Sequence, residues 1–388
     1  MLASSSEQSA HSAAQIRAAR WATRAQFLVF GGLGGLWGVH VPSVKSHHGL
    51  DAAALSWVLL ALALGAVLCL IQAGRVIAQV GARAAALVSG AVMAAALAAV
   101  LVPGDLATLM AVAAVLGAGI AQFDVAINAE GSELEAISGK KVMSGFHGMF
   151  SLGGMAGAGL GALAIRAAVP PSLQLAAAGA AVAAAVAVAC AFMLPVRPAG
   201  RVAVSGYRLP RGALAVLGGL AAVGLLAEGA IYDWSVLYLQ EDVGAAPAVA
   251  ALGFASFSAA MAATRFAGDA LRTHISAPRL LAGSGWLAAA GMALVLWTRQ
   301  PAVALIGLAV VGIGFANVVP ILFMAASRVP GVAAADGIAA VSSIGYVGMV
   351  IGPPLVGGIA HLSSLGWGLG VIMVGGLMLA LGARRLPH

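Results

Sequence analysis

Charged residues are scarce in this chain. Lys, Arg, Asp and Glu make up 9% of its 388 residues, and its mean hydropathy is +1.02. Soluble globular proteins carry roughly 25% of these four residue types. So little charge cannot cover the surface of a water-soluble domain, which excludes the soluble classes and places most of the chain in lipid.

Cysteine is nearly absent as well. Cys69 and Cys190 each lie inside an apolar stretch, so the sequence predicts neither a disulfide framework nor a Cys/His metal site. The chain has no P-loop of the form G-x-x-x-x-G-K-[ST], which excludes an ATP-driven pump. It also lacks a nucleophile constellation. We therefore expect a protein that is not an enzyme and that holds no metal and no organic cofactor.

Long apolar runs take the place of charge. A helix needs about 20 apolar residues to cross the hydrocarbon core, and a crossing segment must satisfy its own backbone because lipid offers no hydrogen-bond partners. Runs such as 84–102 are apolar on every face, unlike the alternating strands of a membrane barrel. The sequence therefore predicts an all-α membrane protein. Its twelve candidate transmembrane helices are residues 24–43, 53–77, 84–102, 106–128, 143–168, 172–194, 212–240, 248–271, 279–298, 301–325, 336–361 and 364–382.

Basic residues predict the topology, because they concentrate in the cytoplasmic loops of membrane proteins. With both termini inside, 17 of the 20 Lys and Arg residues fall in cytoplasmic segments, and Lys45, Arg166 and Arg299 fall outside. An odd number of crossings would spoil this asymmetry. We therefore expect a multi-pass protein of the bacterial inner membrane with both termini in the cytoplasm.

The polar segment 195–211 divides the chain. It holds four arginines, and six candidate helices lie on each side of it. The two sides echo each other, since residues 117–122 (GAGIAQ) are similar to residues 312–317 (GIGFAN). Pseudo-symmetric halves of this kind place a transport site at their interface. The expected organisation is a disordered cytoplasmic tail (1–20), an N-terminal six-helix half (21–194), a cytoplasmic linker (195–211) and a C-terminal six-helix half (212–388).

A short segment in each half resembles a loop motif of the major facilitator superfamily. In that family a loop of the form G-x-L-A-D-R-x-G-R-R joins helices 2 and 3. The corresponding segment here runs from Gly74 to Arg83, with Ala78 at the acidic position, and the second-half copy begins at Arg265 and keeps its acid as Asp269. The resemblance implies a twelve-helix transporter. It also implies that Gly74, Arg83, Arg265 and Asp269 gate the conformational change at the cytoplasmic side.

Other stretches resemble the sugar-permease branch that includes fucose permease. Asp124 and Asn128 fall on the acid and the asparagine of its Glu-Thr-Ala-x-Asn pattern, and His147 falls near a substrate-contacting glutamine. Residues 228–235 (EGAIYDWS) are similar to a helix 7 signature of bacterial permeases in this branch. The aspartate that fucose permease carries in helix 1 is missing here, which leaves the substrate and the coupling scheme open.

Three acids lie well inside the candidate helices: Asp124, Glu228 and Asp233. A charge at the bilayer centre costs about 2.5–3.5 kcal/mol on insertion scales, so such acids mark functional sites by default. We expect all three to serve proton coupling, because a membrane acid can take up a proton on one side and release it on the other. The alternatives are a polar pair that ties two helices for Asp124, a helix–helix hydrogen bond for Glu228, and solvation at the periplasmic end for Asp233.

Five further side chains are candidates for binding a substrate. Asn128 shares a helix face with Asp124 at a spacing of i, i+4, and His147 begins the next candidate helix, where it could pair with Asp124 or simply pack. Trp37 and Tyr232 offer aromatic faces, although such residues at helix ends are usually interface anchors. Asn317 occupies the second-half position that corresponds to Gln122.

Glycine gathers in two candidate helices, 143–168 and 336–361. Small residues at three- and four-residue spacing let membrane helices approach closely. We expect Gly157 and Gly348 to lie on a seam along which the halves rock, with Pro353 interrupting the second helix. The alternative is tight, static packing.

These features together predict a secondary active transporter that works by alternating access. We expect it to couple to protons and to move a small polar organic solute, with a sugar-like solute favoured on resemblance. The alternative is a proton-driven efflux antiporter for drugs or metabolites with the same fold. The expected partners are the solute, protons and membrane lipid, with no nucleic acid, and the expected state is a monomer.

Overall fold

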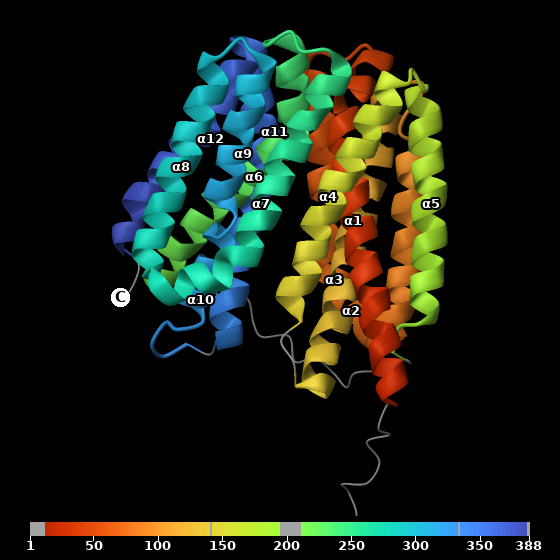
Figure 1. Ribbon diagram of the computed structural model, residues 1–388. Helices are drawn as coiled ribbons and strands as arrows, with labels where there is room; N and C mark the ends of the chain where they lie inside the picture. The colour runs from red at the N-terminus through yellow and green to blue at the C-terminus, as the bar shows by residue number, and fades with distance from the viewer. Residues whose placement is uncertain (1–11, 140–141, 195–210, 333, 386–388) are drawn as a thin grey trace, which may run out of the picture.

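The computed structural model describes residues 12–139, 142–194, 211–332 and 334–385. All regular structure in these ranges is helical, which confirms the all-α class (Figure 1). The elements are α1 (Ala13–His47), α2 (Ala52–Ala99), α3 (Leu106–Ser138), α4 (Met143–Arg166), α5 (Pro171–Ala191), α6 (Ala213–Glu241), α7 (Pro247–His274), α8 (Ala277–Trp297), α9 (Pro301–Phe315), α10 (Val318–Ala326), α11 (Ala334–Leu362), α12 (Leu365–Gly382) and the short 3-10 helix η1 (Ala383–Arg385).

Eleven helices in the described ranges are long and apolar enough to cross a membrane, with α9 and α10 forming one of them. Helix α2 covers two of the stretches that the sequence separates, 53–77 and 84–102. Ser12 caps the first helix: its side chain accepts a hydrogen bond from the Gln15 amide, so α1 begins at Ala13. Residues 13–20 of the expected tail therefore form the start of the first helix. Residues 1–11, and 195–210 of the expected linker, lie outside the described ranges.

Helix α2 folds back on itself at Gly81. This residue has φ 82° and ψ 159°, a backbone conformation that is essentially restricted to glycine. A Cβ added at Gly117 of α3 would meet the Leu62 carbonyl oxygen at 1.9 Å, and one added at Gly119 would meet the Met93 nitrogen at 2.9 Å. In a straight helix Leu62 and Met93 would lie about 46 Å apart. Because Gly117 and Gly119 point to nearly opposite faces of α3, the two arms of α2 pack on either side of α3.

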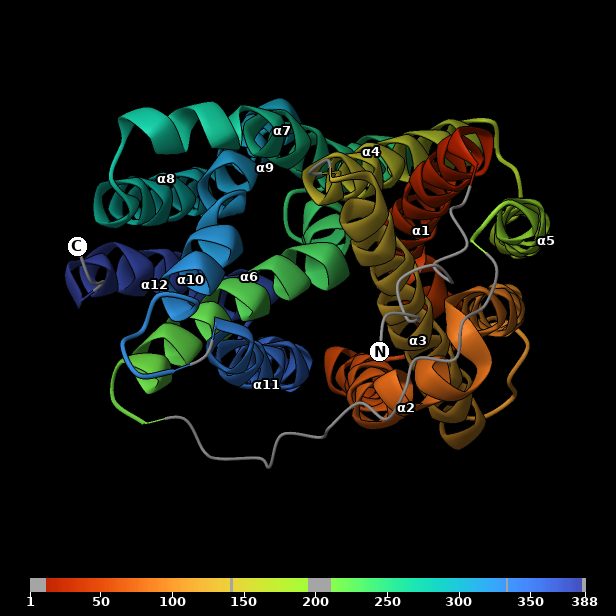
Figure 2. The same cartoon turned by 90° about the horizontal axis from the view of Figure 1, so that it is seen from below.

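The helices form two groups (Figures 1 and 2). In the first helix group, α1–α5, α1 packs on α4, and α2 packs on α3 and α5. In the second helix group, α6–α12, α6 packs on α11 and α12, and α8 packs on α9 and α12. The groups meet where α4 contacts α7, α2 contacts α11 and α1 contacts α6. The closest packing between the groups is therefore made by these six helices.

The glycines of α4 and α11 pack within each group. A Cβ added at Gly157 would lie 2.1 Å from the Gly32 carbonyl oxygen of α1, and one added at Gly348 would lie 2.0 Å from the Ala222 carbonyl oxygen of α6. The expectation that these two glycines lie on the seam between the halves is therefore wrong. They let α4 approach α1, and α11 approach α6, at backbone contact.

Candidate functional site

An arginine joins the two helix groups at membrane depth. Arg265 of α7 forms an ion pair with Glu228 of α6, with 3.4 Å between Nη2 and Oε1. Its Nη1 donates a hydrogen bond of 3.3 Å to Ser151 Oγ of α4, which belongs to the other group. The Tyr232 hydroxyl donates to the same Glu228 oxygen at 2.9 Å. Arg265 thus connects the acid of one group to a hydroxyl of the other.

A proline in the chain helps to hold this arginine. Helix α9 ends at Phe315 and α10 begins at Val318. The Ala316 carbonyl has no i+4 donor, because residue 320 is proline and has no N–H. Arg265 Nε donates to that carbonyl at 3.3 Å. The interrupted helix thereby supplies a backbone acceptor inside the bundle, and Asn317, which is buried, occupies the break.

The second acid of the site is Asp124 of α3. The Asn128 side-chain amide donates to Asp124 Oδ1 and to the Asp124 carbonyl oxygen, both at 2.9 Å. Tyr346 of α11, in the other helix group, lies close enough to interact electrostatically with Asp124. The expected i, i+4 pair is therefore present, and it faces the second group.

His147 lies beside the arginine rather than in a pair with Asp124. Its ring packs edge-on against Phe27, with 5.2 Å between the ring centroids, and it is close enough to Arg265 to interact electrostatically. In the described ranges no hydrogen bond or ion pair joins His147 to Asp124. The residue as a whole is exposed, although one side of its ring packs on Phe27.

The third acid, Asp233 of α6, lies next to the Trp37 indole of α1. The Trp37 nitrogen is buried and makes no hydrogen bond of standard geometry. One residue earlier, Tyr232 stacks on Phe254 with 5.0 Å between the ring centroids. Trp37, Tyr232 and Asp233 therefore meet where α1 and α6 bring the two groups together.

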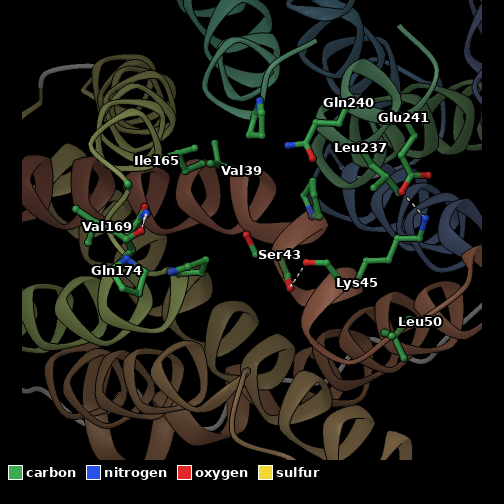
Figure 3. Close-up of a pocket in the computed structure, with 17 residues that line it drawn as sticks. Val39, Ser43, Lys45, Leu50, Ile165, Val169, Gln174, Leu237, Gln240 and Glu241 are labelled. Carbon is green, nitrogen blue, oxygen red and sulfur yellow. Dashed lines mark hydrogen bonds and ion pairs between the residues drawn. The ribbon is translucent and has the colours of Figure 1, made fainter. Parts of the chain in front are cut away.

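The groups are also joined at the end of the bundle where α1 ends and α2 begins, which we call the Lys45 end. Lys45 of α1 forms an ion pair with Glu241 of α6, and His361 of α11 lies 3.9 Å from Asp51 at the start of α2. A cavity of about 620 Å³ lies beside the first pair (Figure 3). Its polar lining includes Ser43, Gln174 and Gln240. Figure 3 shows the Lys45–Glu241 pair bridging two helices at its edge.

Known proteins place this architecture in a family. The sequence matches the profile of the Major Facilitator Superfamily over residues 24–353. The chain belongs to the major facilitator superfamily. It is 33% identical to an uncharacterised MFS-type transporter of Yersinia pestis, with 94% of this chain and 95% of that protein aligned. It is 30% identical to the membrane protein MosC of Rhizobium meliloti, with 92% and 87% aligned.

Solved structures of transporters in the superfamily share the fold. A variant of the nucleoside transporter NupG superposes with a TM-score of 0.77 at 13% identity, covering 95% of this chain and 99% of that one. A D-xylose–proton symporter gives 0.76 at 14% identity, covering 96% and 98%. The transporter FucP in its outward conformation gives 0.66 at 16% identity, covering 95% and 99%. The resemblance to sugar permeases that the motifs suggested therefore extends to the whole fold.

The gating role expected of the superfamily motif stays a prediction. Arg265 lies near the end of the membrane-capable part of α7, Pro247–Ala267, and pairs with Glu228. The side chain of Asp269 lies outside the described residues. Gly74 lies inside α2 with open space around it. Pro353 is buried inside α11, which continues past it, so the expectation that Pro353 interrupts this helix is wrong.

Arg83 has a partner that the sequence did not predict. It interacts electrostatically with Glu130 of α3, an acid that is 4% exposed. Glu130 Oε1 also accepts a 2.8 Å hydrogen bond from the Leu194 amide just beyond α5. The candidate helix 106–128 stops short of Glu130, whereas α3 continues to Ser138. The signal that was missed is the Ala-Glu-Gly run directly after Asn128, which continues the helix.

Two other site residues were also missed. Ser151 reads as a small packing residue, and only the position of Arg265 shows that it accepts a hydrogen bond. Tyr346 lies in the glycine-rich helix α11, where the pattern drew attention to packing. Among the described residues, no group of three or more His, Cys, Asp or Glu side chains could hold a metal ion.

Proposed function

We propose that this protein is a proton-coupled secondary transporter that moves a small polar organic solute, with a sugar-like solute favoured, by alternating access. Asp124 carries the proposal: a carboxylate in a membrane helix, ligated by Asn128 of its own helix and facing Tyr346 of the other group. In the described ranges no cation lies within ion-pair distance of it. A proton is then the natural counter-charge, because an unpaired carboxylate in the bilayer is costly.

Internal repetition supports twelve crossings in two related six-helix halves. The two arms of α2 add a twelfth crossing to the eleven helices. Gly117 packs on the first arm of α2 and Gly312 packs on α7, while Gly119 and Gly314 pack on Met93 and Ala288, respectively. Gly117 and Gly312 are separated in the sequence by the same interval as Gly119 and Gly314. We propose a monomer in the bacterial inner membrane with both termini in the cytoplasm, so that the Lys45 end faces outward.

The hydrogen bonds of Arg265 support a site whose contacts change as the two helix groups move. Its bond to Ser151 crosses from the second group to the first, whereas its bonds to Glu228 and to the Ala316 carbonyl stay within the second group. Separation of the groups would break the first bond and keep the others. Glu228 would then hold the guanidinium in place while Trp37, Asn128, His147 and Asn317 face the solute. In this scheme Asp124, Glu228 and Asp233 are the acids through which protons couple to transport.

Substitution of Asp124 by Asn tests the coupling. Asparagine keeps the shape and can still hydrogen-bond Asn128, but it cannot carry a proton. We expect Asp124→Asn protein in proteoliposomes to lose accumulation driven by a pH gradient by at least about tenfold, while solute exchange at equal pH continues. Accumulation at the wild-type rate would refute the role of Asp124. The direction of the gradient that drives accumulation separates the symporter from the efflux antiporter.

A further inference from the structure

Negative charge is in excess between the two helix groups. The acids at membrane depth are Asp124, Glu228 and Asp233, and the cation there is Arg265, which already pairs with Glu228. In the part of the chain that the structure describes, no Lys, Arg or His side chain lies within ion-pair distance of Asp124 or Asp233. Two carboxylates therefore lack a counter-charge, and each needs a proton or a cationic ligand.

The two carboxylates differ in their surroundings. Asp124 is held by the Asn128 amide of its own helix. Asp233 lies beside the Trp37 indole, which comes from the opposite helix group and is only 6% exposed. The face of a tryptophan is the best aromatic partner for a cation. A carboxylate next to an indole is thus a pair of groups suited to an ammonium ion. The neighbour of Asp124 is instead the Asn128 amide.

Close packing fixes this pair at the interface. A Cβ added at Gly38, the residue after Trp37, would meet the Tyr232 carbonyl oxygen at 2.8 Å and the Phe254 ring at 2.6 Å. The backbones of α1 and α6 therefore touch directly beside Trp37 and Asp233. A ligand held between these two side chains would contact both groups when they are close and lose one set of contacts when they separate.

We infer that the solute is an organic cation, a hydrophilic molecule with a protonated amine, and that Asp233 and Trp37 receive its ammonium group. This inference rests on the proposed transport function and narrows its substrate class. With a neutral sugar, a proton would have to supply the whole counter-charge of the Asp233 carboxylate. An anionic solute would add to the negative charge already there. An ammonium group would supply the missing charge and lie against the indole.

Matched probes test the substrate class on the purified full-length protein. The probes are glucosamine, N-acetylglucosamine and glucose, and a second set of ethanolamine, N-acetylethanolamine and ethylene glycol. Within each set the molecules differ chiefly in whether a cationic nitrogen is present. A ligand that binds only the folded protein raises its melting temperature. We expect the amine of each set to raise it and the neutral members to leave it unchanged. Equal stabilisation by the neutral members, or none by either amine, overturns the inference.

Variants test the assignment to Asp233 and Trp37. Asp233→Asn should weaken amine binding at least about tenfold, since it leaves a buried ammonium unpaired. Trp37→Leu should weaken it about threefold to tenfold, since it removes the aromatic face. Asp233→Glu keeps the carboxylate and should bind the amine better than Asp233→Asn does. The matched control is Glu133→Gln, which removes an exposed acid on α3 and should change nothing. Retained amine preference in Asp233→Asn, or unchanged amine affinity in Trp37→Leu, overturns the assignment.

The outcome is separable from the proposed coupling. If the wild-type protein binds amines selectively while Asp124→Asn still accumulates solute on a pH gradient, the substrate class stands and the proton-coupling role of Asp124 fails. If Asp124→Asn loses coupling while neutral sugars bind as well as amines, the coupling stands and the ammonium site fails.

Discussion

Single residues that interrupt helices shape this protein. Pro320 leaves the Ala316 carbonyl without a helical donor. Arg265 Nε donates a hydrogen bond of 3.3 Å to that carbonyl, and the same side chain forms the ion pair with Glu228. Gly81 turns α2 back on itself through a conformation with φ 82°. Neither residue is a binding group. Each decides where a helix stops, and so which side chains of neighbouring helices can meet.

Substitution of Gly81 by Ala should destabilise the fold. A residue with a side chain pays about 1–3 kcal/mol for this backbone conformation. The matched control is Gly74→Ala in the same helix, where the backbone is helical and a Cβ would meet nothing within 4 Å. That change should be neutral or stabilising by about 0.5–1 kcal/mol. Thermal unfolding in detergent compares the two, and equal melting temperatures would show that Gly81 is not strained.

Helix pairs within one group are held by different contacts from helix pairs that join the two groups. Within a group, glycines bring backbones together, as Gly157 does with α1 and Gly348 with α6. Between the groups, polar contacts accompany the close approach of α1 and α6 at Gly38: Arg265 with Ser151 in the middle, and Lys45 with Glu241 at the Lys45 end. Backbone packing is fixed, whereas exposed ion pairs are weak and reversible. The division suits groups that move as units.

Reversal of one charge at the Lys45 end should favour its opening. In Lys45→Glu two acids face each other at Glu241, while Lys45→Glu with Glu241→Lys restores the attraction. An exposed pair is worth about 0.2–1 kcal/mol, so we expect the open population to rise about twofold to fivefold in the single variant. Spin labels on Gly104 and Ala302, in different groups, measure the distance. The same distribution in single and double variants would show that the pair does not hold this end.

The whole molecule consists of two helix groups that touch through six helices. The charge distribution predicts its orientation: we expect the basic excess on the side of the N-terminus, and Lys45, Arg166 and Arg299 on the other side. The asymmetry matters because basic loops stay in the cytoplasm. If the chain crosses twelve times, the two termini lie on one side.

Cysteine labelling tests this orientation. In a background without Cys69 and Cys190, a cysteine at the exposed Ser46 should react with a membrane-impermeant maleimide in intact cells. A cysteine at Ser205, in the segment expected to be a cytoplasmic linker, should react only after the cells are permeabilised. The permeabilised sample is the control for reactivity. The opposite pattern would invert every inside and outside assignment.

The sequence by itself determined the class of the protein and its local features. Apolar runs of membrane length can satisfy their backbone only as helices, so the helices lie close to where they were expected. The Asp124–Asn128 pair follows from i, i+4 spacing, because both residues belong to one helix. The repeated Gly-x-Gly motifs at Gly117 and Gly312 also mark equivalent close contacts.

Only the tertiary structure decided how the helices face one another. Helices that are apolar all round have no polar face to show which side is turned inward. The sequence therefore could not show that Glu228 meets Arg265 from another helix, that Ser151 lies opposite them, or that Gly157 packs within its own group. Those contacts depend on the rotation and crossing of whole helices, which backbone packing at glycine sets once the chain has folded.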